Sequence, residues 1–331
     1  MSGEGQLPDR ADRLVKMAWH HLHQVARIGL RQLLRRPIVD LLATRHIAPE
    51  GYAIDPQAAA FVRISNVMPT YDSTGVGGAR RSMDLTAPIV DVPRDESVTI
   101  EDHRAPSGSA VRCYTPRNAR PGLLVYFHGG GFTLGSLASH DGFLRFLSAR
   151  SRVRIAAVDY RLAPEHRFPA PLDDALAAFR FAAEALGADP ARIAVGGDSA
   201  GGTISAVIAQ ETRGDRVRPC FQLLIYPATD LTRVMPSHRH FATGLFLTQT
   251  MIDWFMAQYL NNPGEVHDPR VSPLFAKELR AVAPALVITA GFDPLRRAEG
   301  QVHGFVLFGG VIDEARREIE RIADDLGRAL A

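Results

Sequence analysis

A serine between glycines is the feature of this sequence with the clearest chemical meaning. The run Gly197-Asp198-Ser199-Ala200-Gly201 follows an apolar stretch at residues 192–196 and precedes a predicted helix. In this strand–turn–helix setting, the pattern G-x-S-x-G places the serine in a turn so sharp that flanking side chains would collide, which explains the glycines. The turn lifts the Ser199 hydroxyl above a sheet and leaves the Ala200 amide at a helix start, where it can stabilise an oxyanion. We therefore predict Ser199 as a nucleophile and Ala200 as an oxyanion-hole donor.

A run of glycines after an earlier strand complements that serine. His128-Gly129-Gly130-Gly131 follows the apolar stretch at residues 123–127. A tetrahedral intermediate needs two or three backbone N–H groups that converge on one oxygen, and consecutive glycines let the backbone approach that closely. Gly129, Gly130 and Gly131 are therefore all candidate oxyanion donors. We expect His128 to orient the loop through its ring and not to transfer a proton.

The same glycines also fit a second class of site. Gly129, Gly131 and Gly135 after one strand, with Asp159 at the end of the next, mimic a dinucleotide-binding fingerprint. That fingerprint requires a helix to open at the glycines, whereas Phe132-Thr133-Leu134 and a polar loop follow them here. It also leaves the serine turn unexplained. We favour the serine-based chemistry and expect no cofactor.

Short apolar runs alternate with helical stretches from about residue 95 onward. The runs that predict strands are residues 97–103, 110–114, 123–127, 155–158, 193–195, 221–225 and 286–289. Helices are expected over 172–186, 203–212 and 311–330. This alternation predicts an α/β fold with a mostly parallel sheet and helices on both faces, in which reacting groups follow the carboxyl ends of strands. Both glycine motifs occupy such positions.

Three motifs in this order resemble the bacterial hormone-sensitive-lipase-like esterases of the α/β-hydrolase superfamily. They are His128–Gly131, the run Asp159-Tyr160-Arg161-Leu162-Ala163-Pro164-Glu165, and Gly197–Gly202. The resemblance covers about residues 50–331. It implies an eight-stranded α/β-hydrolase sheet and cofactor-independent hydrolysis of short- to medium-chain carboxylic esters. It also implies an N-terminal helical cap (1–85) on a catalytic domain (86–331), with a second cap segment at about 232–262. In that family the loop at 159–165 is structural.

The resemblance also implies the acid and the base. A serine becomes a useful nucleophile when an imidazole takes its proton, and a carboxylate must hold that imidazole in one tautomer. In this fold the chain order is serine, acid, histidine. His303-Gly304-Phe305 matches the catalytic-histidine motif, and Gly291-Phe292-Asp293-Pro294-Leu295 supplies the matching carboxylate, Asp293. Asp230, which follows the strand at 221–225, is the reserve candidate.

The connection between Asp293 and His303 departs from the family pattern. Only nine residues separate them, where the family has a whole helix and the last strand. A parallel crossover needs a dozen or more residues, so we predict a shortened last helix–strand unit. The gap falls near Leu295-Arg296, and residues 298–302 resemble the tail of the last strand. A loop without that support holds His303 less firmly. The alternative hypothesis is therefore a catalytically impaired or non-catalytic protein that binds a small apolar ligand.

Composition limits the partners and the compartment. The chain has 331 residues and a formal net charge of +2, which is too small to argue for nucleic acid. Its two cysteines, Cys113 and Cys220, are too few for a disulfide framework, which favours a reducing compartment. No signal-peptide core or membrane-spanning run is evident. We expect a cytoplasmic monomer or homodimer without stable membrane insertion, without a metal, and with a small ester as its substrate.

Residues 1 to about 85 differ from the rest of the chain, most clearly in their first part. Apolar residues recur at helical spacing, and basic residues decorate the same segment; they include Leu14, Met17, Ala18, Leu22, Val25, Leu33, Leu34, Arg27, Arg31, Arg35 and Arg36. A basic amphipathic helix can lie on a membrane surface. We favour a helix whose apolar face covers the catalytic domain, since the spacing fits a buried stripe equally well. His20, His21 and His23 have no carboxylate or cysteine at ligand spacing, which disfavours a metal site.

Overall fold

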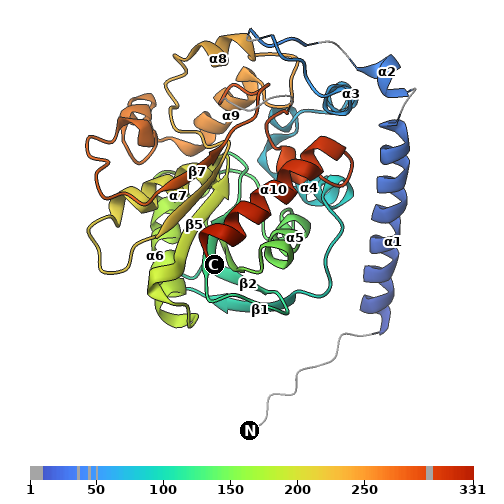
Figure 1. Ribbon diagram of the computed structural model, residues 1–331. Coiled ribbons are helices and arrows are strands. Elements are labelled where there is room, and N and C mark those ends of the chain that lie inside the picture. Colours follow the sequence, from blue (N-terminus) through green and yellow to red (C-terminus); the bar gives the residue numbers. More distant parts are fainter. Residues whose placement is uncertain (1–9, 36–37, 44–45, 50, 296–300) are drawn as a thin grey trace.

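A seven-stranded sheet forms the centre of the protein (Figure 1). The computed structural model describes residues 10–35, 38–43, 46–49, 51–295 and 301–331, with side chains from residue 22 onward. The strands are β1 (Thr99–Arg104), β2 (Ala110–Thr115), β3 (Leu123–Phe127), β4 (Arg154–Asp159), β5 (Ile193–Asp198), β6 (Phe221–Ile225) and β7 (Ala285–Ile288). They lie in the order β1-β2-β4-β3-β5-β6-β7, and β2 is antiparallel to both of its neighbours. All other pairs are parallel, which confirms the predicted mostly parallel sheet.

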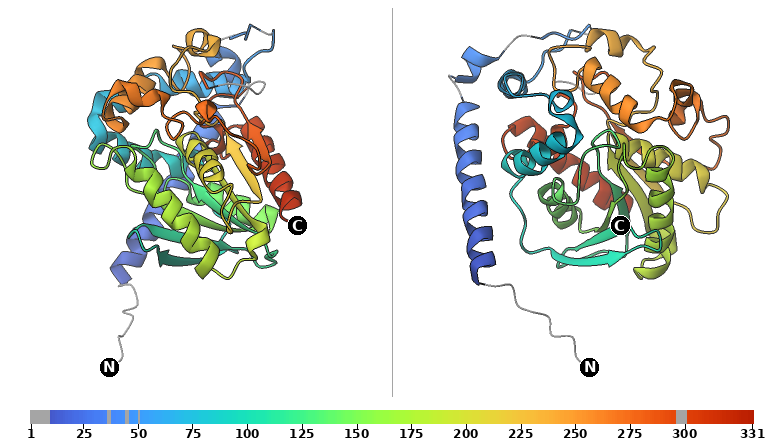
Figure 2. Two further views of the ribbon diagram at one scale, coloured as in Figure 1. Left: turned by 90° about the vertical axis from the view of Figure 1, so that its left-hand side faces the viewer. Right: turned by 180° about the vertical axis from the view of Figure 1, so that it is seen from behind.

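Both faces of this sheet are covered by helices. The helices α5 (Asp141–Ser151) and α10 (Asp313–Ala329) pack against one face, and α6 (Ala170–Ala185) and α7 (Ala200–Glu211) pack against the other (Figure 2). The residues of strand β3 are apolar throughout because both faces of the strand are buried. Leu124 and Tyr126 join the core on the α5/α10 side, whereas Leu123, Val125 and Phe127 join the core on the α6/α7 side. Successive side chains on a strand point to opposite faces, so a strand buried on both faces is an unbroken apolar run.

Two further groups of helices lie outside these layers, and the first of them includes a long helix that runs along one side of the molecule (Figure 1). The first comprises α1 (Arg10–Leu33), α2 (Ile38–Leu42), α3 (Pro56–Ser65) and α4 (Tyr71–Val90), and the second comprises α8 (Pro236–His240) and α9 (Gln249–Tyr259). Helix α4 bends at Gly75, where φ is +66°, and it continues past the predicted domain boundary at residue 85 to Val90. Within the described ranges, no helix has both the length and the apolarity that crossing a membrane requires.

The sheet has one strand fewer, among the described residues, than the eight that the resemblance implies. Beyond β7, Phe292 and Val302 form an isolated parallel bridge, and the Phe292 N–H donates to the Gln301 carbonyl at 2.9 Å. Only nine residues lie between the two bridged positions, too few for a helical crossover and a full strand. The expectation of eight strands is therefore corrected. Arg296 and residues 298–300, on which the predicted gap and strand tail partly rest, lie outside the described residues.

Candidate active site

Ser199 occupies the sharp turn between β5 and α7. Its backbone angles are φ +52° and ψ −118°, a region that side-chain-bearing residues rarely adopt and that costs energy unless the surroundings enforce it. The Ser199 N–H donates to the Ile225 carbonyl at 2.8 Å, which fixes the turn to the neighbouring strand. A Cβ atom at Gly197 or at Gly201 would overlap the Phe127 carbonyl. The two glycines therefore allow the turn to sit against β3, as the sequence pattern predicts.

Three side chains that the sequence singled out lie in one hydrogen-bonded row. The Nε2 atom of His303 is 2.9 Å from the Ser199 hydroxyl oxygen, and its Nδ1 atom is 2.7 Å from a carboxylate oxygen of Asp293. Because a carboxylate only accepts, Nδ1 carries the proton and Nε2 accepts from Ser199. The other oxygen of Asp293 accepts from the Leu295 amide at 2.9 Å, and Asp293 is fully buried. The nine-residue connection thus permits the contact.

The reserve carboxylate, Asp230, has a different role. One of its oxygens accepts from the amide of Thr232 at 2.8 Å and from the Thr232 hydroxyl at 2.6 Å. This is the local hydrogen-bonding pattern of an aspartate that closes a turn. The structure therefore favours Asp293 over Asp230 as the partner of the histidine.

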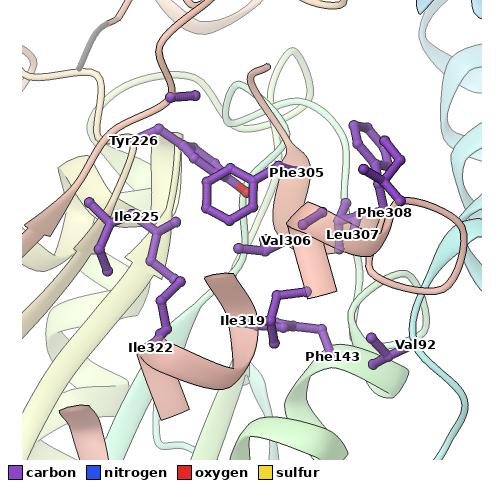
Figure 3. Packing of buried hydrophobic residues seen from close by; sticks show 14 of the residues in the cluster. Val92, Phe143, Ile225, Tyr226, Phe305, Val306, Leu307, Phe308, Ile319 and Ile322 are labelled. Atoms are coloured by element: carbon purple, nitrogen blue, oxygen red, sulfur yellow. The ribbon is translucent and has the colours of Figure 1, made fainter. Parts of the chain in front are cut away.

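Packing supports the loop that carries His303. Figure 3 shows Phe305 beside Tyr226, with Val306 and Leu307 next to them and Ile319 of α10 below. The ring of Tyr226 lies 4.6 Å from the His303 ring and 5.4 Å from the Phe305 ring, centroid to centroid. Phe305 and Val306 are buried in the core cluster that includes α5 and α10. Sequence patterns do not reveal this support, because it joins the end of β6, the histidine loop and α10, which are far apart in the chain.

The three candidate glycines of the oxyanion loop are not equivalent. The Gly129 amide donates to a carboxylate oxygen of Asp198 at 2.9 Å, so it is not available to an oxyanion, and Gly129 is removed from the candidate donors. Gly130 and Gly131 have φ values of +118° and +58°, which suit glycine. Among the described residues, no backbone or side-chain acceptor engages the amides of Gly130 and Gly131. Both glycines line the cavity with Ser199 and Ala200, and the amides of Gly130, Gly131 and Ala200 stay candidates.

Asp198, the neighbour of Ser199, makes several of the contacts that hold this loop. Its buried carboxylate also accepts from the Tyr126 hydroxyl at 2.8 Å, and it lies 3.3 Å from Nε2 of His140. Burial alone would raise the pKa of Asp198, but the electrostatic interaction with His140 and the hydrogen bond from Tyr126 outweigh it and lower the pKa. Burial opposes charge on His140 too, and the Asp198 carboxylate nevertheless raises its pKa. The Asp198 carboxylate, held by Tyr126 and in contact with His140, therefore anchors the Gly129 amide.

His128 is a neutral support for the same loop. Burial, and then the charge of His140, lowers the pKa of His128 to about 4. Its Nδ1 atom lies 2.8 Å from the Gly129 carbonyl, and its ring stacks on Tyr160 at 4.4 Å. A Cβ atom at Gly135 would overlap the His128 ring. These contacts agree with the expectation that His128 orients the loop and takes no part in proton transfer.

An apolar cavity of about 390 Å³ opens above these groups. Ser199, His303 and the glycine loop form one part of its wall, and α3, α4, α9 and the segments next to them contribute much of the remainder. The cap contributes apolar and aromatic side chains, among them Phe61, Met83, Met251, Phe255 and Tyr259. A Cβ atom at Gly131 would overlap the Phe255 ring, so the second cap segment packs directly on the glycine loop. A mostly apolar cavity with few polar groups at one point is typical of a small-molecule site.

Comparison with known proteins places the chain in a family. A model described as "alpha/beta hydrolase fold" matches residues 124–306. The chain is 33% identical over 322 residues to ethyl acetate hydrolase from Pseudomonas putida, which covers 84% of this chain and all of that protein. It is also 40% identical over 251 residues to the carboxylesterase NlhH of Mycobacterium tuberculosis, covering 66% of this chain and 78% of NlhH. The chain belongs to the hormone-sensitive-lipase-like family of α/β-hydrolases.

Other relatives of this α/β-hydrolase agree with the assignment. Carboxylic ester hydrolase LipN of Mycobacterium tuberculosis is 46% identical over 205 residues, 59% of this chain, and the chain spans about half (52%) of the length of LipN. A solved esterase from the archaeon Pyrobaculum calidifontis has a TM-score of 0.77 at 34% identity, over 84% of this chain and 99% of that structure. An ester hydrolase from the metagenome of Lake Arreo has a TM-score of 0.78 at 34% identity, over 83% of this chain and 98% of that structure.

The loop at residues 159–165 of this α/β-hydrolase connects the cap to the site. Arg80 of α4 donates to the Thr133 carbonyl at 2.9 Å and to the Ala163 carbonyl at 2.8 Å, and it pairs with Glu165 at 2.8 Å. Arg161 pairs through two hydrogen bonds, both 2.8 Å, with the buried Asp174 of α6. A guanidinium fork suits such paired contacts. These contacts hold the loop between α4 and α6, which agrees with the structural role that the resemblance implies.

Proposed function

We propose that this α/β-hydrolase hydrolyses short- to medium-chain carboxylic esters, with Ser199 as the nucleophile, His303 as the base and Asp293 as its partner. The observation that carries the proposal is the hydrogen-bonded row from Ser199 through His303 to Asp293 at the wall of an apolar cavity. The names of the relatives, which include carboxylesterases and an ethyl acetate hydrolase, support the same class of substrate.

The first half of the proposed reaction transfers the acyl group to the enzyme. The Ser199 hydroxyl gives its proton to Nε2 of His303 while its oxygen attacks the ester carbonyl carbon. The carbonyl oxygen becomes an oxyanion, and the amides of Gly130, Gly131 and Ala200 are the donors that we assign to it. His303 then returns the proton to the alkoxide as the bond from carbonyl carbon to alcohol oxygen breaks. The alcohol leaves, and the acyl group stays on Ser199.

The second half of the reaction uses water in place of the serine. Water gives a proton to His303 and attacks the acyl carbon, and the same amides stabilise the second oxyanion. Ser199 leaves with the proton from His303, and the carboxylic acid is released. Asp293 keeps the His303 ring in the tautomer that both halves require and stabilises its protonated form.

Two observations disfavour the alternative of a non-catalytic ligand-binding protein. The short connection does not prevent the hydrogen bonds of His303 to Ser199 and Asp293. The packing of Phe305 and Val306 also replaces part of the support that a last strand would give the loop. The cytoplasmic location and the choice between monomer and homodimer stay predictions of the sequence.

Hydrolysis of chromogenic p-nitrophenyl esters of increasing chain length tests the proposal. We expect turnover of short and medium acyl chains by the wild type and loss of at least about 10³-fold in kcat for Ser199→Ala. Thr212→Ala is a matched control, because Thr212 lies at the far end of α7 and its hydroxyl donates to the Ile208 carbonyl at 2.7 Å, away from the row. Equal activity of Ser199→Ala and the wild type would show that Ser199 is not the nucleophile.

A further inference from the structure

Helix α1 is attached to the rest of the protein by part of its polar side. Arg27 donates to the carbonyls of Pro88 and Ile89 at the end of α4, the latter at 3.1 Å. Arg31 pairs with Asp313 at the start of α10 at 3.3 Å. Leu30 and Leu34 accompany these arginines, since Leu34 is buried and Leu30 lines the cavity. These contacts fix which side of α1 faces the protein.

The opposite side of α1 is apolar and exposed. The exposed fractions of Leu22, Val25, Ile28 and Leu33 are 66%, 57%, 58% and 47%. Leu22, Val25 and Leu33 lie on one side of the helix, because Val25 follows Leu22 by three residues and Leu33 follows it by eleven, which are about one and three helical turns. A surface helix normally turns its apolar stripe toward the core. The expectation that the apolar face of this helix covers the catalytic domain is therefore corrected, since much of that face points outward.

The charge of the segment favours one kind of partner for this face. Residues 10–36 carry seven of the 38 lysines and arginines but one of the 36 acidic residues, against 31 basic and 35 acidic residues elsewhere. Five of the seven basic residues remain, still in excess of the one acidic residue, when Arg27 and Arg31, which bind the rest of the protein, are set aside. Two copies of α1 packed face to face would bring two strongly cationic segments together, which charge repulsion opposes. Nucleic acid would match the charge but would leave the apolar side chains in water. An anionic lipid surface satisfies both, because it attracts the cations and buries the apolar side chains.

We propose that α1 docks this hydrolase on anionic lipid surfaces, with Leu22, Val25, Ile28 and Leu33 buried at the boundary of headgroups and acyl chains. Figures 1 and 2 show α1 running along one side of the molecule, so the helix can lie flat on a surface without displacing the cap. Leu30, on the other side of the same helix, lines the cavity, as does the 60% exposed Met68. Docking would therefore bring one wall of the cavity next to the lipid. The docking itself does not depend on the esterase reaction.

Vesicle sedimentation of the full chain tests the docking. The probes are phosphatidylcholine vesicles with and without about one quarter phosphatidylglycerol. The test variant is Leu22→Glu/Val25→Glu, and the matched control is Leu279→Glu/Val287→Glu, which changes two side chains of 55% and 53% exposure outside α1. We expect the wild type and the control to sediment with anionic vesicles, and the test variant to partition about tenfold or more weakly. Binding should also weaken as salt rises. Thermal unfolding followed by circular dichroism checks that each variant is folded.

Two results would overturn the proposal. The first is a failure of the wild type to sediment with anionic vesicles, or equal sedimentation of the test variant and the control. The second is a wild-type dimer in light scattering that becomes a monomer in Leu22→Glu/Val25→Glu while no vesicle binding occurs, because it assigns the face to a second copy of the chain.

Discussion

The amide of Gly129 donates to the carboxylate of Asp198 at 2.9 Å, which ties the glycine loop to the residue beside Ser199. The carboxylate in turn accepts from the Tyr126 hydroxyl and lies 3.3 Å from Nε2 of His140. One buried anion thus fixes the relative position of the two glycine motifs. This explains how a loop of three glycines, which has little conformational preference of its own, can present ordered amides to the cavity.

Replacement of Asp198 should damage both stability and activity. Asp198→Ala leaves His140 buried without its anion, and we expect the free energy of unfolding in urea to fall by about 3–5 kcal/mol. The released Gly129 amide should also loosen the oxyanion loop and lower kcat more than it changes KM. Tyr126→Phe is the control, because it removes a single hydrogen bond and should cost about 1 kcal/mol with little loss of kcat. Similar effects of the two substitutions would contradict the role given to Asp198.

The two candidate carboxylates should respond very differently to removal of their charge. Asp293→Asn breaks the contact that fixes the tautomer of His303, and we expect kcat for an ester to fall roughly 10³- to 10⁴-fold. Asp230→Asn is the matched control, because Asp230 closes a turn with Thr232 and should leave kcat within about twofold of the wild type. Steady-state kinetics of the two variants decide between them. A larger loss for Asp230→Asn would reverse the assignment.

The support of the His303 loop is also testable. Phe305→Ala removes a buried ring beside Tyr226, so we expect a loss of about 3–5 kcal/mol in the free energy of unfolding. The folded variant should in addition lose about 10- to 100-fold in kcat, since small displacements of a catalytic base are costly. Ile322→Ala in α10 removes a comparably buried side chain without touching the loop, so it should lower stability by about 2–5 kcal/mol and leave kcat unchanged. Equal kcat values for the two variants would argue against this support.

Most of the fold could be predicted from the sequence, because each feature depends on neighbours in the chain. Buried strands such as β3 are continuous apolar runs, and the Ser199 turn depends on glycines two residues before and two residues after it. The role of Asp198 could not be predicted, since it depends on Gly129 and His140, which belong to another loop. The outward-facing apolar side of α1 was also missed, because spacing alone does not reveal which side of a helix faces the protein.

Asp91 gives a prediction for the dependence of stability on pH. Burial raises the pKa of this carboxyl from an ordinary value of 3.8 to about 7, against the hydrogen bonds that its oxygens accept from Phe143 and Val92. The folded state therefore favours the protonated carboxyl more than the unfolded state does. The contribution of this group to the free energy of unfolding is fully present below pH 3.8 and is lost as the pH rises toward 7, by about 1.4 kcal/mol per pH unit. Asp91→Asn lacks this loss. Urea unfolding at several pH values should show that the free energy of unfolding of the variant rises relative to that of the wild type from pH 4 to 7. A difference between the two that stays constant with pH would contradict the prediction.

The most direct test of the central claim is covalent modification of Ser199 by a fluorophosphonate, followed by intact mass and peptide mapping. In the expected reaction the Ser199 oxygen displaces fluoride from phosphorus while His303 takes the serine proton, which requires the row from Ser199 to Asp293 to be assembled. We predict one phosphonyl group per chain in the wild type, located on Ser199, no label in Ser199→Ala, and strongly slowed labelling in Asp293→Asn. Folded wild-type protein that takes up no label, or that carries it on another residue, would contradict the assignment of Ser199, His303 and Asp293 as the catalytic residues.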